Sequence, residues 1–442
     1  MKGIMKRFYG FLLLIVLAIL ACSHGSNTAQ EDEEMQRRIP AEAVHPLNNE
    51  EDLDVLIEKI GDSRIVLLGE SSHGTSEFYT WRAALSKKLI IEKGFDIIAV
   101  EADWADAYHV NFYIKDDVGS DAQNVLNNFD RWPQWMWNNQ ETANLVEWLH
   151  FHNSRVVGSH KVGFYGLDVY GIWESLEIAY NYLLESNPGA AEQAKDVIDC
   201  FKKYNFDEQQ YARATLNGQN CEALLTDLLS AVQAHIAGEP TKKESIDLLQ
   251  NTLVAFNAEK YYRTAARNSA TSWNIRDRHM SLTLNNLLDH YGPDSRIIVW
   301  EHNTHVGDAR ATDMAADGMV TIGQLEREKH GKWDVFIIGF GTNSGKVLAA
   351  QSWGSKVQTM TIPPGRRNSW EWILHQQNPA DKIIFMEPLR DMPYYKKPIG
   401  HRAIGVVYNP AAEAGNYVPS VIPERYDAFI FIDRTNPLKA LP

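Results

Sequence analysis

An acid, an imidazole and a guanidinium follow one apolar run in the segment IVLLGESSHGTSEFYTWR, residues 65–82. Glu70 and His73 come directly after that run, and Arg82 follows nine residues after His73. Near neutral pH, an uncharged histidine can take a proton from water, and an adjacent carboxylate fixes the ring's tautomer and stabilises the imidazolium. A positioned arginine can stabilise a developing oxyanion. These residue types therefore indicate general-base hydrolysis.

No protein nucleophile is evident beside these residues. The segment GESSHG has the wrong spacing for a G-x-S-x-G nucleophile elbow, so only proximity favours Ser71 and Ser72. The sequence contains no H-E-x-x-H motif, and GFGTNSG (339–345) fits neither a dinucleotide loop nor a phosphate loop. The pattern favours activation of water, and we expect neither a metal nor another cofactor.

Three further apolar runs also end in ionisable side chains. These side chains are Glu101 and Asp103 after the second run, Asp168 after the third, and Glu301, His302 and His305 after the fourth. Ligands of open α/β sheets bind beyond the carboxyl ends of the strands. We therefore expect these strand ends to build one shared site, with Asp103 and Asp168 in contact with the substrate.

A helix that begins at Thr75 places an arginine on its apolar face. Its stripe is Phe78, Trp81, Arg82, Leu85 and Leu89. A buried guanidinium needs a carboxylate partner, which Glu70 or Glu101 could supply. The alternative is that the stem of Arg82 packs while its head reaches solvent. The positive end of this helix should also lower the pKa of His73.

A second helix, in SWNIRDRHMSLTLNNLLDHY (272–291), repeats this feature. Arg276 and Asp277 lie on its apolar stripe, whereas Arg278 and His279 do not. We therefore expect Arg276 to be the inward-facing cation, and Asp277 to hold it in place.

The elements that must position these residues indicate an α/β fold. Short apolar runs rich in β-branched residues occur at 64–70, 95–103, 161–168, 295–305, 333–341, 382–388, 403–408 and 427–433. Runs of this kind, interleaved with helices, are typical of a mainly parallel β-sheet flanked by helices. Residues 172 to 290 contain long helical patterns and no convincing strand, which predicts a largely helical insertion subdomain.

Tryptophans are concentrated in RWPQWMWNNQETANLVEWLH, residues 131–150. Such density is more often part of a hydrophobic core, but it can also form the wall of a site for a large apolar ligand. We expect Trp137 to contact the substrate.

The first residues are typical of bacterial export. A basic start, the apolar run FLLLIVLAIL and the ending Ile19-Leu20-Ala21-Cys22 resemble a lipoprotein box. The predicted units are a signal peptide at 1–21, a lipidated flexible tether at 22–44, the α/β core at 45–171 and 291–442, and the helical insertion at 172–290. We expect Cys22 to carry lipid and to anchor the protein to a membrane of the cell envelope, facing the periplasm or the exterior; a plain secretory signal is the alternative.

Net charge limits the possible binding partners, and cysteine content limits the possible disulfides. The formal net charge of −14 argues against nucleic acid and anionic membrane surfaces as partners. Apart from Cys22 the sequence contains Cys200 and Cys221, which either form a disulfide or remain two buried thiols.

The segments GESSHGTSEF with its following arginine, VEAD, NIRDRHM, HNTHV and RYDAFIFID resemble the erythromycin esterase family in content and order. The resemblance runs from about residue 45 to 436. It implies an α/β core with a helical insertion, and hydrolysis of the lactone of macrolide antibiotics by an activated water. The site residues that it implies are His73 as general base, Glu70 beside it, and Arg82, Glu101, Arg276, His302 and His305. The helical insertion and the Trp-rich segment match only in pattern.

Two alternatives remain at this point. Glu70, His73, His302 and His305 are plausible ligands of a metal ion, which would make the protein a metal-dependent hydrolase. An exported, tethered chain could also be a binding lipoprotein that takes up a metal or haem.

Overall fold

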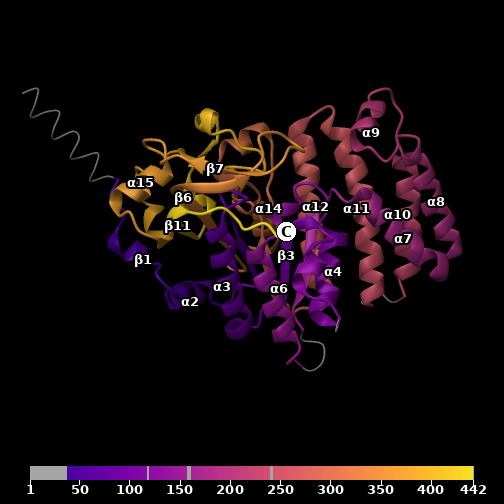
Figure 1. The fold of residues 1–442 in the computed structure, drawn as a ribbon, viewed down its shortest axis with the longest axis horizontal. Helices are drawn as coiled ribbons and strands as arrows, with labels where there is room; N and C mark the ends of the chain where they lie inside the picture. The colour runs from indigo at the N-terminus through magenta and orange to yellow at the C-terminus, as the bar shows by residue number, and fades with distance from the viewer. Residues whose placement is uncertain (1–36, 117–118, 157–160, 239–241, 442) are drawn as a thin grey trace, which may run out of the picture.

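The structure, a computed structural model, describes residues 37–116, 119–156, 161–238 and 242–441. The predicted signal peptide, Cys22 and the tether up to residue 36 lie outside the described residues. A twisted sheet crosses the molecule with helices on both faces, and a bundle of helices extends from one side (Figure 1). Among the described residues, no helix combines the length and the apolar character that a membrane span requires.

Within the described residues, the main sheet has nine strands in the order β1-β8-β11-β6-β2-β5-β3-β4, and β7 pairs with β6. The strands are β1 Val44–Pro46, β2 Ile65–Leu68, β3 Ile97–Asp103, β4 Gly163–Asp168, β5 Ile297–Trp300, β6 Val335–Ala349, β7 Gln358–Ile362, β8 Lys382–Phe385 and β11 Ala428–Thr435. The series from β11 to β4 is parallel, whereas β1, β7 and β8 run antiparallel to their neighbours. The predicted mainly parallel sheet is confirmed.

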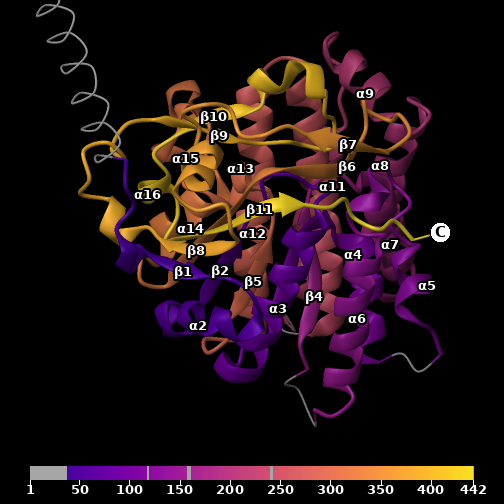
Figure 2. The ribbon, with the colours of Figure 1, turned by 60° about the vertical axis from the view of Figure 1, so that its left-hand side comes forward.

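Helices cover both faces of the sheet (Figure 2). They are α2 Asp54–Ile60, α3 Ser76–Lys93, α4 Trp104–Lys115, α5 Ala122–Leu126, α6 Gln140–Asn153, α7 Ile172–Ser186, α8 Pro188–Lys202, α9 Glu208–Thr215, α10 Glu222–Ile236, α11 Lys243–Ala265, α12 Ser269–Tyr291, α13 Asn303–Val306, α14 Ile322–His330, α15 Trp370–Gln377 and α16 Ile422–Arg425.

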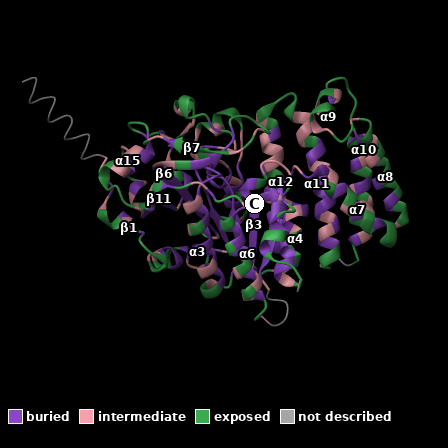
Figure 3. Cartoon of the chain, viewed as in Figure 1, coloured by how far each residue is buried: buried purple, intermediate pink, exposed green. Residues whose placement is uncertain are grey.

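Alternate residues of the central strands face two different helical layers. Val66 and Ile298 belong to the core shared with Leu85 of α3, whereas Leu67 belongs to the core shared with Leu284 of α12. Both faces of the central strands are therefore buried, which explains why their sequences are apolar without alternation. Buried residues accordingly concentrate along the sheet in Figure 3.

The described residues between β4 and β5 form helices α7 to α12 and no strand. Helices α7 to α11 pack around a core of their own, which includes Leu176, Val197 and Leu228. Helix α12 instead contributes Met280 and Leu284 to the core of the sheet. The helical insertion is thus present, and the boundaries of the predicted units stay predictions.

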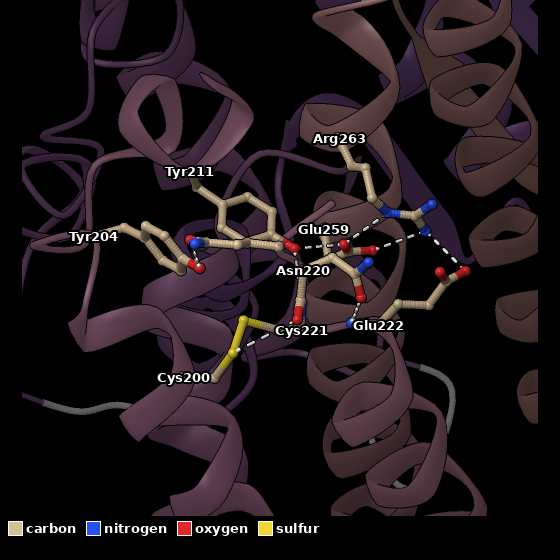
Figure 4. The surroundings of a disulfide bond; sticks show 9 residues. Cys200, Tyr204, Tyr211, Asn220, Cys221, Glu222, Glu259 and Arg263 are labelled. Carbon is tan, nitrogen blue, oxygen red and sulfur yellow. Dashed lines mark hydrogen bonds and ion pairs between the residues drawn. A yellow bond between two sulfur atoms is a disulfide. The ribbon is translucent and has the colours of Figure 1, made fainter. Parts of the chain in front are cut away.

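Cys200 and Cys221 form a disulfide that joins the end of α8 to the residue before α10 (Figure 4). Of the two states that the sequence left open, a disulfide and two buried thiols, the structure has the disulfide. It closes a loop of the chain that contains α9.

One predicted strand is wrong. Residues 403–408 form only isolated bridges, and the strand β9 precedes them at Ile399–Arg402, paired with β10 Tyr417–Ser420. The prediction failed because β9 carries buried polar residues, with His401 paired to Glu371 and Arg402 paired to Glu413. An apolar pattern cannot identify a strand that buries ion pairs.

Candidate active site

The turn after β2 brings Glu70 and His73 together. His73 Nδ1 lies 2.9 Å from Glu70 Oε1, and both side chains are buried. Gly69 allows this turn to pack closely, because a Cβ at that position would stand 2.1 Å from Oδ1 of Asn303. With Nδ1 directed at the carboxylate, Nε2 is the ring nitrogen left for chemistry.

Arg82 holds the other oxygen of Glu70. Its Nη2 donates to Glu70 Oε2 at 2.7 Å, and the side chain is fully buried. The guanidinium lies over the rings of Tyr79 and Trp300, at 4.5 and 4.7 Å from their centroids. The predicted buried pair is therefore present with Glu70 as partner, and Arg82 acts on His73 through that carboxylate.

Two carboxylates control the charge of His73. Burial acts to lower the pKa of His73, but Glu101 and Glu70 outweigh it, so the pKa lies above its ordinary value. The predicted lowering of this pKa is wrong: α3 does begin after Thr75, but the two acids dominate the potential at the ring.

Arg276 joins the ends of two strands. Its Nε and Nη2 donate to the two oxygens of Asp168 at 2.8 and 2.6 Å, and Nη2 also donates to Glu101 Oε1 at 2.7 Å. Burial acts to raise the pKa of Glu101, but His305, Arg276 and His73 hold it below its ordinary value. Glu101 is therefore an anion, and its second oxygen accepts the backbone N–H of His302 at 2.8 Å.

His305 is held by α12. Arg276 Nη1 donates to His305 Nε2 at 2.8 Å, while His305 Nδ1 lies 3.0 Å from Asp277 Oδ2. The ring also stacks on Trp273 at 4.3 Å between centroids. With both nitrogens engaged, His305 positions Arg276 rather than offering a free base. Asp277 therefore holds His305, and through it Arg276.

His302 lies directly beside His73, with 4.9 Å between their ring centroids. It caps α13, and its Nδ1 accepts the backbone N–H of Thr304 at 3.2 Å. Burial, together with His73, holds the pKa of His302 well below its ordinary value. The ring is thus uncharged, and the hydrogen bond to Nδ1 leaves its proton on Nε2.

A cavity of about 480 Å³ opens onto this cluster. His73, Glu101, Asp168 and Arg276 line it, whereas Glu70, Arg82, His302 and His305 support these residues from behind. The sequence-predicted residues therefore converge on one place beyond the carboxyl ends of β2, β3, β4 and β5.

The three residues predicted to contact the substrate all line the cavity, but each also has a structural bond. Trp137 Nε1 donates to the carbonyl oxygen of Glu101 at 3.1 Å, and Asp168 is committed to Arg276. Asp103 accepts the backbone N–H of Gly171 at 2.9 Å. Burial raises the pKa of Asp103 to about 6.

Several cavity residues were not predicted. Arg131 pairs with Asp103, Glu174 and Glu208. Burial, together with the charges of Asp103 and Glu174, raises the pKa of the nearby Asp106 to about 8. The other unpredicted lining residues include Trp132, Tyr170, Tyr261, Tyr262 and Trp353. The Trp-rich segment gave a signal for Trp132, because a ligand wall was one of its two interpretations; the segment also supplies core residues such as Trp135.

His279 of α12 lies off the predicted apolar stripe but is buried all the same. Its Nδ1 lies 3.1 Å from Nδ2 of Asn257 on α11. A single apolar stripe cannot predict this contact, since α12 packs against α11 as well as against the sheet.

The residues proposed as metal ligands do not form a metal site. Among the described residues, no group of three or more His, Cys, Asp or Glu side chains is arranged to hold a metal ion. His305 and Glu70 instead hold arginines.

The fold and the site together define an α/β protein with a histidine–carboxylate–arginine cluster at the end of a parallel sheet. The erythromycin esterase family model matches residues 90–435. The chain therefore belongs to the erythromycin esterase family, and this membership supports hydrolase activity.

Individual relatives are distant. The type II erythromycin esterase of Escherichia coli is 24% identical and covers 81% of this chain and 90% of its own. YbfO of Bacillus subtilis (strain 168) is 22% identical over 99% of both chains.

Solved structures share the fold. A Bacillus cereus protein superimposes with a TM-score of 0.75 at 19% identity, covering 90% of this chain and 97% of its own. A mutant of the erythromycin esterase EreC in its open conformation gives 0.65 at 15% identity, covering 89% and 97%. A succinoglycan biosynthesis protein gives 0.72 at 20% identity, covering 90% and 96%.

Proposed function

We propose that this protein is a carboxylic ester hydrolase in which His73 activates water. We propose an ester or lactone as its substrate, and specifically the macrolactone of macrolide antibiotics such as erythromycin. One observation carries the proposal: His73 faces a cavity with its Nδ1 fixed by Glu70, while Arg276 and Glu101 line the same cavity.

The proposed reaction uses the cavity as follows. His73 Nε2 takes a proton from water as the oxygen attacks the ester carbonyl, and Glu70 stabilises the imidazolium that forms. Arg276 supplies the positive charge that faces the developing oxyanion. When the tetrahedral intermediate collapses, His73 returns its proton to the leaving alkoxide. The products are a carboxylic acid and an alcohol, which in a lactone stay in one ring-opened molecule.

Two findings support an ester as the substrate. The family membership and the Escherichia coli relative, an erythromycin esterase, point to that chemistry. The aromatic side chains of the cavity wall, among them Trp137 and Phe129, suit a large and mostly apolar ligand.

The test is hydrolysis of macrolides of different ring size, with mass spectrometry to detect the addition of one water. We expect His73→Ala to abolish the product, because general-base help contributes about 10²–10⁴-fold. His375→Ala is the matched control, since His375 also pairs with a carboxylate, Asp433, but does not line the cavity. A His73→Ala variant that retains most of its activity would remove His73 as the base.

We further propose that the protein is exported and anchored to a membrane of the cell envelope through lipidated Cys22, facing the periplasm or the exterior. The lipoprotein-like ending at Cys22 supports this. Fractionation of cells that express Cys22→Ser is the test. The proposal predicts that Cys22→Ser is lost from the membrane fraction. It is contradicted if the wild-type protein and Cys22→Ser both remain in the membrane fraction and neither carries lipid.

A further inference from the structure

Two tryptophans from distant parts of the chain meet at the cavity. Trp132 belongs to the segment between α5 and α6, and Trp353 to the segment between β6 and β7. Their ring centroids lie 4.5 Å apart, and both residues line the cavity that contains His73. The indole Nε1 of Trp132 also donates to the carbonyl oxygen of Ser355 at 3.2 Å.

Trp353 contacts Trp132 but does not belong to the hydrophobic core. Its exposed fraction is 67%, so its ring contributes little to the buried interior. Unlike the more exposed Trp333, Trp353 lines the cavity. What the ring does contribute is the contact with Trp132.

The loop that carries Trp353 is held at its root and bonded to itself at its tip. Its root is fixed at Ala350, whose N–H donates to Val406 and whose carbonyl accepts from Tyr408, both at 2.9 Å. Its tip is closed on itself, because the Ser355 hydroxyl bonds both the N–H and the carbonyl of Ser352. The tip can therefore leave Trp132 without breaking any pairing between β6 and β7.

We propose that Trp132 and Trp353 form an aromatic gate that sets the size of substrate able to reach His73. The inference rests on the proposed ester hydrolase function and adds a specificity determinant to it. A cavity of about 480 Å³ lies toward the lower part of the range of about 300–1,000 Å³ for ligand pockets. A small ester enters with the gate closed, whereas a macrolactone that carries sugars needs it open.

The first test measures access directly and needs no turnover. His73→Cys places a thiol at the inner end of the cavity, in a chain that also carries Cys22→Ser, so that the remaining cysteines are those of the disulfide. The labelling rates of this thiol by iodoacetamide and by a fluorescein maleimide are compared before and after Trp353→Ala. Should His73→Cys not fold, Val406→Cys is used, because Val406 lines the same cavity.

We expect Trp353→Ala to accelerate labelling by the bulky maleimide on the order of tenfold while leaving iodoacetamide unchanged. Trp132→Phe, which keeps a ring but loses the bond to Ser355, should give a smaller acceleration of the same kind. Trp333→Ala is the matched control: Trp333 is 94% exposed and does not line the cavity, so its removal should change neither rate.

The second test uses otherwise unmodified enzyme and compares kcat/KM for erythromycin with kcat/KM for phenyl acetate. The gate predicts that Trp353→Ala raises this ratio. If the bulky reagent labels no faster, or if both reagents accelerate equally, the gate is wrong. Failure of the proposed function would appear separately, as hydrolysis that survives His73→Ala.

Discussion

Arg82 and Arg276 are both inward-facing arginines, but they differ in what their charge does. Arg276 lines the cavity, so its charge faces the substrate. Arg82 is fully buried behind Glu70, and two of its nitrogens, Nε and Nη1, have no hydrogen-bond partner within the described part of the chain. Arg82 therefore fixes Glu70, and Glu70 fixes the ring of His73.

The main effect of Arg82→Ala should be a lower free energy of unfolding. The substitution leaves Glu70 buried without its cation, which costs about 3–5 kcal/mol in the free energy of unfolding. Urea denaturation measures this loss. Arg278→Ala is the control, since Arg278 is exposed on α12 and should change stability little. An unchanged midpoint for Arg82→Ala would contradict the burial of this pair.

The charge of His73 should shape the pH dependence of the reaction. The base must be uncharged, and its pKa is raised, so kcat/KM should fall as the pH drops through that raised value. Glu101→Gln removes the stronger of the two charges that raise this pKa, and the acid limb should move to lower pH.

The measurement is the pH profile of kcat/KM for both enzymes. Glu387→Gln is the control, because Glu387 is exposed and lies outside this cavity. It should leave the acid limb of the pH profile unchanged. A limb that does not move in Glu101→Gln would show that another group sets it.

At the scale of elements, α9 links the helical insertion to the cavity. Glu208 and Gln209 at its start line the cavity, and Glu208 also accepts from Arg131 at 3.2 Å. The helix is anchored at its middle, where the hydroxyl of Tyr211 donates to Glu259 at 2.5 Å and accepts the N–H of Cys221 at 2.9 Å (Figure 4). The disulfide thus closes the loop that carries one wall of the cavity.

Cys200→Ser combined with Cys221→Ser should loosen this wall. The bond spans 21 residues, and opening a loop of that length costs roughly 3 kcal/mol of stability in the chain-entropy account. KM should rise with little change in kcat, because α9 lies in the cavity wall and not beside His73. Reduction of the wild-type enzyme should reproduce the effect and should not affect the double variant further; equal KM values for both forms would contradict this role.

At the scale of the whole molecule, the helical insertion has a core separate from the cores on the two faces of the sheet. The helices α7 to α11 share one core, whereas α12 belongs to the core of the sheet and carries Arg276. The site therefore depends on the sheet core, and the helical insertion supplies only part of the cavity wall.

Hydrogen exchange should reveal this division. We expect amides of β2, β5 and β6 to be protected most strongly, and α8 and α10 to exchange through a less costly opening, because each core opens as its own cooperative unit. Amides of α12 should follow the sheet rather than α11. Exchange of α12 together with α8 and α10 would instead favour the predicted boundary at residue 290.

The sequence by itself determined the sheet, the helical insertion and which ionisable residues stand at the ends of the strands. Strands buried on both faces must be apolar throughout, and parallel strands bring Glu70, Glu101, Asp168 and His302 to one edge, so local patterns were sufficient.

Only the tertiary structure decided which partner each charge takes, and with it the pKa of His73. Pairing energies depend on distances between residues far apart in the chain, such as Glu101 and Arg276. The contact of Trp132 with Trp353 had no local signal for the same reason: it exists only where two loops, separated by more than two hundred residues, meet over the cavity.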